Sequence, residues 1–226
     1  MRNYSKALCK VEKNESALDI YLYDDICDKK FDWSTWEEVE SETGAKYIAD
    51  LIASAGDVKE INVHINSYGG FLNQGVAIYT QLCASAAQIT TYVDGVAASI
   101  ASLIAMAGNK VVMGKCSLLM IHNPWTCACG NAKDFRKLAD DLDVMSEAIS
   151  NAYLDKANGK LSKEKLTELL DAETWLTAEE CKAYGLCDEI VEAFESEDEA
   201  KASAAKQLSN FQKMAMAKAA DRKSVV

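Results

Sequence analysis

The feature that most constrains the fold is the repeated alternation of short apolar strands and helical segments through the first half of the chain. Apolar patterns of strand length predict strands at 17–23, 60–66, 89–93, 110–113 and 117–121. Helices are expected at 43–55, 72–85 and 97–107, the last of them small, apolar and therefore buried. Strands and helices in this order predict an α/β layer structure in which most strands are parallel.

The second half of the chain changes character after Pro124, the only proline. Residues 131–156 predict one long helix, whose length suggests an arm that projects from the body. A shorter helix is expected at 161–170. A last helix begins at the capping box Thr177–Glu180, ends at Gly185 and precedes a strand at 186–191. Apolar residues recur along the long helix at spacings of three and four: Phe135, Leu138, Leu142, Met145, Ile149 and Tyr153.

Charge and composition limit the classes of partner. The net charge of −11 over 226 residues argues against nucleic acid, because no basic stripe is available to neutralise phosphates. No secretory signal and no membrane-length apolar run is visible, so we expect a cytoplasmic protein without a membrane partner. We expect one domain over residues 1–192. The charged segment 193–226 is expected to be a solvated helix or a disordered tail.

The eight cysteines do not form a recognisable metal site. No two are separated by the two-residue gap of a zinc knuckle, and the closest pair, Cys127 and Cys129, has no second ligand pair. Most of the others lie in apolar stretches, where cysteine acts as a small hydrophobic residue. We therefore expect reduced thiols, no metal and no cofactor.

Three sequence features together provide the parts for acyl transfer. Ser99 opens the small apolar helix, His122 ends an apolar strand, and the pair Gly69–Gly70 follows another strand. A serine needs a nearby base to act as a nucleophile, and backbone amides at glycines or a helix start can stabilise an oxyanion. Taken singly, each has an ordinary structural explanation: a helix N-cap for Ser99, a core histidine for His122, a turn for the glycines.

The remaining candidates are weaker or ambiguous. His64 lies inside a strand, where alternation indicates a packing role. Ser102, one turn after Ser99, is interpreted as a small packing residue. The acid that would orient the histidine is Asp171 or Glu173, and either carboxylate is equally compatible with a solvated position. Residues 108–115 resemble a phosphate-binding loop only faintly, because the glycine spacing is too long and Cys116 replaces the required Ser or Thr.

In combination, these segments resemble the proteolytic subunit of the Clp protease, and most closely the Clp-like proteases of phages and prophages. The resemblance covers about residues 15–192. It implies a spiral of repeated β-β-α units, related to the crotonase fold, with a projecting helix inserted at about 125–160. The matching stretches are 65–70 (INSYGG), 95–99 (GVAAS), 120–124 (MIHNP), 173–180 (ETWLTAEE) and 184–188 (YGLCD).

The resemblance also implies roles for single residues. Ser99 is expected to be the nucleophile and His122 the base, with the backbone amides of Gly70 and Ile100 as oxyanion donors. Glu173 occupies the family's acid position, which is usually aspartate, and Asp171 remains the alternative acid. Tyr68 stands where the family usually has proline, a change in loop stiffness that we expect to be tolerated.

At the level of the molecule, the resemblance implies a serine endopeptidase of polypeptides, assembled as a homo-oligomeric ring. The ring is expected to be a heptamer or a stack of rings, with an AAA+ ATPase as an implied partner. The phage-like relatives imply capsid or scaffold maturation, or protein degradation. Three alternatives remain: a non-catalytic ring component, a crotonase-type acyl-CoA enzyme, and a serine-lysine dyad that would use Lys110 or Lys115 and usually a membrane anchor.

Overall fold

A computed structural model describes residues 12–13 and 17–192, and the expected tail at 193–226 lies outside this part. Within the described residues, the main sheet has eight strands. Its centre is a parallel run in the order β2-β5-β6-β7, and β10 extends it beside β7. The bounds are β2 Ala17–Leu22, β5 Glu60–Ser67, β6 Gln88–Ala98, β7 Lys110–Gly114 and β10 Glu189–Val191.

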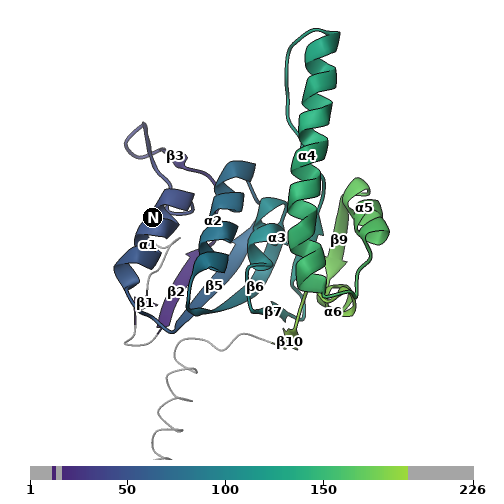
Figure 1. Cartoon of the computed structure of the whole chain (residues 1–226). Helices are drawn as coiled ribbons and strands as arrows, with labels where there is room; N and C mark the ends of the chain where they lie inside the picture. The colour runs from purple at the N-terminus through teal and green to yellow at the C-terminus, as the bar shows by residue number, and fades with distance from the viewer. Residues whose placement is uncertain (1–11, 14–16, 193–226) are drawn as a thin grey trace, which may run out of the picture. The chain divides into compact units, whose positions relative to one another are not determined.

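Three helices cover one face of this sheet (Figure 1): α1 (Ala45–Ala55), α2 (Leu72–Ala84) and α3 (Ile100–Ala105). Strand β5 explains the layering, because Ile61, Val63 and Ile65 alternate with more exposed residues and are buried. Every residue of α3 is buried, as its small apolar sequence predicts. The core therefore lies between the sheet and these helices, and the expected mostly parallel α/β fold is confirmed.

The C-terminal part adds a long helix and a small subassembly beside β6. Helix α4 (Ala132–Ala157) extends beyond the sheet (Figure 1). It begins at a capping box in which Asn131 and Asp134 hydrogen-bond to each other's backbone amides. Strand β8 (Leu118–Ile121) pairs in parallel with the end of β6 and antiparallel with β9 (Thr174–Thr177). The remaining helices are α5 (Lys163–Asp171) and α6 (Ala178–Tyr184), the latter with the expected capping box and Gly185 cap.

The structure differs from the sequence expectations in several elements. Ala97 and Ala98 continue strand β6 instead of starting a helix, since they pair with Leu119 and Met120 of β8. The short strands β1 (Glu12–Lys13) and β9 and the hairpin of β3 (Lys29–Asp32) and β4 (Glu37–Glu40) were not expected. Their length of two to four residues is too short for a clear alternation pattern. None of the described helices has the length and hydrophobicity that crossing a membrane requires.

Candidate active site

Ser99 occupies a sharp turn between β6 and α3. Its backbone has φ 54° and ψ −130°, a combination that non-glycine residues rarely adopt and that costs about 1–3 kcal/mol. Its amide donates to the Met120 carbonyl at 2.9 Å, which fixes the turn against β8. Although Ser99 stands at the N-cap position, its side chain makes no capping hydrogen bond. The ordinary N-cap explanation is therefore wrong, and the hydroxyl is directed to another group.

That group is His122. Strand β8 runs parallel to β6 with Met120 opposite Ala98, so the carboxyl ends of both strands lie at the same edge of the sheet. Ser99 follows one strand and His122 follows the other. The distance between His122 Nε2 and Ser99 Oγ is 2.7 Å, which is a hydrogen bond. Two residues far apart in the sequence thus form the serine-histidine pair that the sequence pattern predicts.

Neither candidate acid hydrogen-bonds to His122 among the described residues. Asp171 accepts a hydrogen bond from Asn123 Nδ2 at 2.7 Å, and the side-chain Oδ1 of Asn123 accepts one from the Ser146 hydroxyl. Glu173 has an exposed side chain and a left-handed backbone with φ 49°. The pairing of Ile121 with Thr174 nevertheless brings Glu173 to the position opposite His122. The structure therefore gives Asp171 a different partner, and Glu173 lies one residue beyond the last pair of β8 and β9, as His122 does.

Gly69 and Gly70 form the wall of the site that faces Ser99. Both have positive φ angles, 103° and 150°. A Cβ atom on Gly69 would lie 2.6 Å from Ser99 Cβ, and one on Gly70 would lie 2.3 Å from the Ile26 carbonyl oxygen. Only glycine fits at these two positions without a shift of the backbone. The sequence stretch 69–70 is therefore more than a turn, since it packs directly against the candidate nucleophile.

Two backbone amides beside Ser99 have no acceptor among the described residues. Ile26 bonds to the carbonyl of Gly69 and to the amide of Phe71, so the intervening Gly70 amide points away from Ile26. Ile100 is the first residue of α3, where helical amides lack an intrahelical partner. The expected oxyanion donors are thus both available for a ligand, and the start of a helix favours negative charge there.

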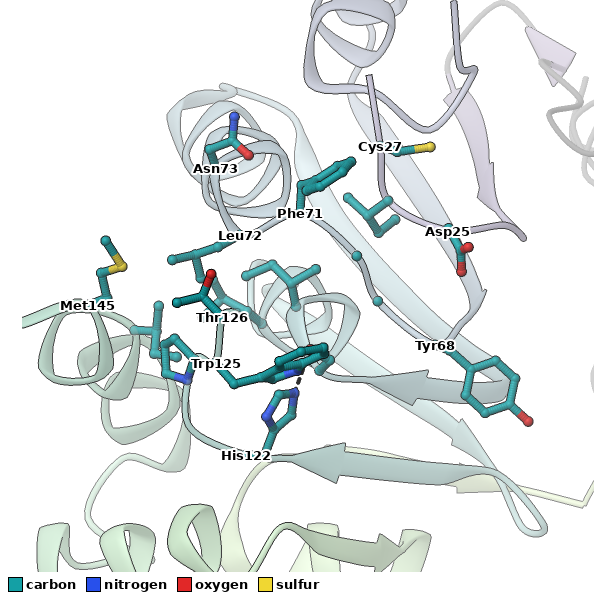
Figure 2. Close-up of a pocket in the computed structure, with 18 of the residues that line it drawn as sticks. Asp25, Cys27, Tyr68, Phe71, Leu72, Asn73, His122, Trp125, Thr126 and Met145 are labelled. Atoms are coloured by element: carbon teal, nitrogen blue, oxygen red, sulfur yellow. Dashed lines mark hydrogen bonds between the residues drawn. The ribbon is translucent and has the colours of Figure 1, made fainter. Parts of the chain in front are cut away.

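A cavity of about 1190 Å³ opens over the serine-histidine pair. Figure 2 shows Phe71, Leu72, Trp125 and Met145 around the same space as His122. The sequence reasoning did not identify Trp125, although a tryptophan directly after His122-Asn123-Pro124 was a usable signal; its side chain is 74% exposed. Helix α4 contributes one apolar wall: Leu138, Leu142, Met145, Ile149 and Tyr153.

The other residues considered from sequence lie elsewhere or act differently. His64 stacks between Tyr21 and Tyr92 and contacts Asp94 through Nδ1 at 2.9 Å, so it is not part of the site. Lys110 and Lys115 form ion pairs with Glu189 and Glu192, whereas the hydroxyl of Ser99 is bonded to His122, so the serine-lysine alternative gains no support. Cysteine was expected to act as a small hydrophobic residue in apolar stretches. Cys181 and Cys187 are buried and fit this role, whereas Cys83 and Cys116 are exposed and do not.

Comparison with known proteins decides the family. The sequence model of the Clp protease family matches residues 8–194. The chain belongs to the Clp protease family. Two relatives of this Clp protease family member are named proteolytic subunits. Subunit 2 of the ATP-dependent Clp protease of Chlamydia trachomatis serovar D is 32% identical over 202 residues, covering 84% of this chain and 94% of the relative. The subunit of Bacteroides fragilis strain ATCC 25285 is 33% identical over 138 residues, covering 59% and 64%.

The Clp protease family is a family of peptidases, and this chain belongs to it. The match extends over the whole described part, so the strands that carry Ser99 and His122 lie within it. The sequence resemblance to the family is confirmed. The more specific likeness to phage proteins stays a prediction.

Proposed function

We propose that this Clp protease family member is a serine endopeptidase that cleaves polypeptides through an acyl-enzyme. The observation that carries the proposal is the 2.7 Å contact between His122 Nε2 and Ser99 Oγ at a strained strand-to-helix turn. Strained residues persist where the surrounding structure holds them, and they cluster at functional sites. Family membership adds independent support, because the named relatives are proteolytic subunits.

The chemistry follows from the atoms that converge on the cavity. Ser99 Oγ attacks the scissile carbonyl carbon while His122 Nε2 takes the hydroxyl proton. The carbonyl oxygen gains negative charge, which the amides of Gly70 and Ile100 stabilise. When the peptide C–N bond breaks, His122 donates that proton to the leaving amine and the acyl group stays on Ser99. A water molecule, deprotonated by His122, then releases the acyl group as a carboxylate and restores the hydroxyl of Ser99.

Glu173 is the proposed acid of the triad. It directly precedes β9, as His122 directly follows β8, and these strands end with the pair Ile121–Thr174. Its side chain is exposed and has no hydrogen bond among the described residues. A rotation of this side chain toward His122 Nδ1 costs no existing interaction. Asp171, the alternative acid, is held by Asn123 and would have to release it. We therefore assign Glu173 the role of orienting the imidazole and stabilising its protonated form.

The proposed working form is a homo-oligomeric ring, heptameric or stacked, that encloses the active sites. The projecting part of α4 supports this, since Phe135 and Met145 remain 49% and 42% exposed in the single chain. Exposed apolar side chains that gather on one element are typical of interaction surfaces. The ATP-dependent Clp protease named in the comparison and the sequence resemblance suggest an AAA+ ATPase partner. The phage resemblance suggests capsid or scaffold processing in a bacterial cytoplasm.

A non-catalytic ring component is the second candidate function. The observation in its favour is that neither Asp171 nor Glu173 hydrogen-bonds to His122 within the described residues. The crotonase-type alternative gains no such support, because acyl-CoA chemistry on this fold does not require a serine-histidine contact.

Fluorophosphonate labelling separates the two candidates. Wild-type protein is expected to be labelled at Ser99, whereas Ser99→Ala should abolish labelling and peptide cleavage with the fold intact. Removing one hydroxyl leaves little cavity, so thermal unfolding should change little. Ser54→Ala, at an exposed serine of α1, is the control and should be labelled like the wild type. Absence of labelling in the wild type would favour the non-catalytic candidate, and retained labelling in Ser99→Ala would move the nucleophile elsewhere.

A further inference from the structure

A buried chain of hydroxyl groups lies behind the candidate nucleophile. Ser102 Oγ is 2.6 Å from the carbonyl oxygen of Ser99 and 2.7 Å from the hydroxyl of Tyr153 on α4. Both side chains are buried, with exposed fractions of 0% for Ser102 and 2% for Tyr153. The interpretation of Ser102 as a mere packing residue is therefore incomplete.

The direction of these hydrogen bonds follows from counting protons. A serine hydroxyl has one proton, and a carbonyl oxygen can only accept, so Ser102 donates to Ser99. Tyr153 must then donate to Ser102 Oγ. Burial raises the pKa of Tyr153 to about 12, so the phenol retains its proton at neutral pH. The chain therefore runs from Tyr153 through Ser102 to the backbone of Ser99.

The carbonyl at the end of this chain belongs to a peptide with a proposed catalytic function. The carbonyl of Ser99 and the amide of Ile100 are two ends of one planar peptide unit. The same carbonyl also accepts the Ser102 amide at 3.0 Å. Two donors on the carbonyl fix the plane of the peptide, and they polarise it so that its N–H becomes a stronger donor. That N–H is one of the two proposed oxyanion donors.

We propose that Ser102 and Tyr153 are positioning residues that hold and polarise the Ser99–Ile100 peptide for oxyanion binding. The proposal rests on the serine-peptidase function proposed above. The backbone of Ser99 has a positive φ angle, which costs a non-glycine residue free energy. Contacts with the surrounding residues must therefore hold it in this conformation. Tyr153 suits the task since Ile149, Ala152 and Ala157 anchor its part of α4 in the core.

The test compares Tyr153→Phe, Ser102→Ala and the double variant with wild type in fluorophosphonate labelling. Oxyanion binding acts on the rate, so Ser102→Ala should label about 10-fold more slowly and Tyr153→Phe about 3-fold more slowly, less than the loss of a direct oxyanion donor. Intact-mass measurement should show the same final stoichiometry as in the wild type. The pH midpoint of the rate should also stay unchanged, because His122 is not affected.

Thr91→Val is the matched control. Thr91 is buried and donates its hydroxyl to the Ala105 carbonyl at the other end of α3, at 2.8 Å. This variant removes an equivalent hydrogen bond and should lose stability without a change in labelling rate. A purely structural role of Ser102 and Tyr153 would make their variants behave like it, or would lower the labelled fraction.

The double variant tests whether Tyr153 acts through Ser102. Because Tyr153 acts through Ser102, the double variant should label no more slowly than Ser102→Ala alone. Multiplicative losses in the double variant, or rates equal to wild type in both single variants, would overturn the positioning role while the peptidase function stands. A wild-type protein that resists labelling would instead overturn the peptidase function, and the positioning role with it.

Discussion

At the residue scale, the two histidines illustrate how position decides chemistry. His122 ends a strand at the sheet edge and contacts a serine hydroxyl at 2.7 Å. His64 lies within β5, where its ring is stacked between two tyrosines and its Nδ1 contacts the Asp94 carboxylate. The first environment places the imidazole where its Nε2 can accept the proton of the Ser99 hydroxyl. The second holds the ring in a packed polar cluster.

The histidine variants should separate these environments. His122→Ala is expected to lower peptide cleavage by several orders of magnitude, since His122 is the base that hydrogen-bonds to Ser99 Oγ within the described part of the chain. His64→Gln should keep activity and reduce stability by about 1 kcal/mol, because it loses ring stacking and the contact with Asp94. Steady-state kinetics and denaturant unfolding measure the two effects. An inactive His64→Gln variant beside an active His122→Ala variant would place the site elsewhere.

The acid has its own test at this scale. Glu173→Gln keeps the shape of the side chain and removes the charge that favours a protonated His122. The rate should fall toward the ~10⁴-fold loss known for the acid of a serine triad. Asp171→Asn is the matched control and should have a milder effect, because Asp171 is held by Asn123. The reverse ranking in turnover measurements would assign the acid role to Asp171.

At the scale of elements, long patterned segments were predictable and special backbone conformations were not. Helix α4 followed from its apolar spacing, and α6 from its capping box and terminal glycine. The turn at Ser99 was predicted as helix, because Ala97 and Ala98 are small residues that suit either structure. Only their pairing with β8, which is a tertiary interaction, makes them strand.

The candidate site shows the same division. The serine, the histidine and the glycine pair could be named from the sequence, since each ends or begins a patterned segment. The hydrogen bond between Ser102 and Tyr153 could not be predicted from the sequence. It joins α3 to α4 across 51 residues and depends on how the two helices pack. The hairpin beside the cavity also escaped prediction, as its strands are only four residues long.

The contact between α2 and α3 gives an element-scale prediction. A Cβ atom on Gly75 would lie 2.1 Å from Ile100 Cγ1, and Ile100 is buried. Gly75→Ala should therefore destabilise the protein by about 1–3 kcal/mol through overpacking. It should also slow fluorophosphonate labelling, because Ile100 carries a proposed oxyanion amide. Denaturant unfolding and labelling rates check both effects, with Val76→Ala at the exposed neighbouring position as control. Wild-type stability in Gly75→Ala would contradict this close packing.

At the scale of the whole molecule, the apolar stripe of α4 gives a test of the proposed assembly. Leu142→Glu combined with Met145→Glu would place two charges in the proposed subunit seam, at a cost of several kcal/mol if they are buried without partners. We expect a ring-sized homo-oligomer for the wild type in light scattering and smaller species for this double variant. Ala139→Glu with Asn151→Glu adds the same charge at exposed positions and is the control. A wild type that is monomeric at micromolar concentrations would contradict the proposed ring.

The order of the site residues along the polypeptide has a consequence for its synthesis. Synthesis runs from the N-terminus, so Gly70, Ser99 and His122 leave the ribosome before Tyr153 and before β9, which pairs with the strand preceding His122. A half-made chain thus carries both reactive side chains while the elements that hold them are still missing. We therefore expect the hydrogen bond between His122 Nε2 and Ser99 Oγ to form only after β9 has been made. Under the proposed peptidase function, no cleavage is expected from the chain before that point.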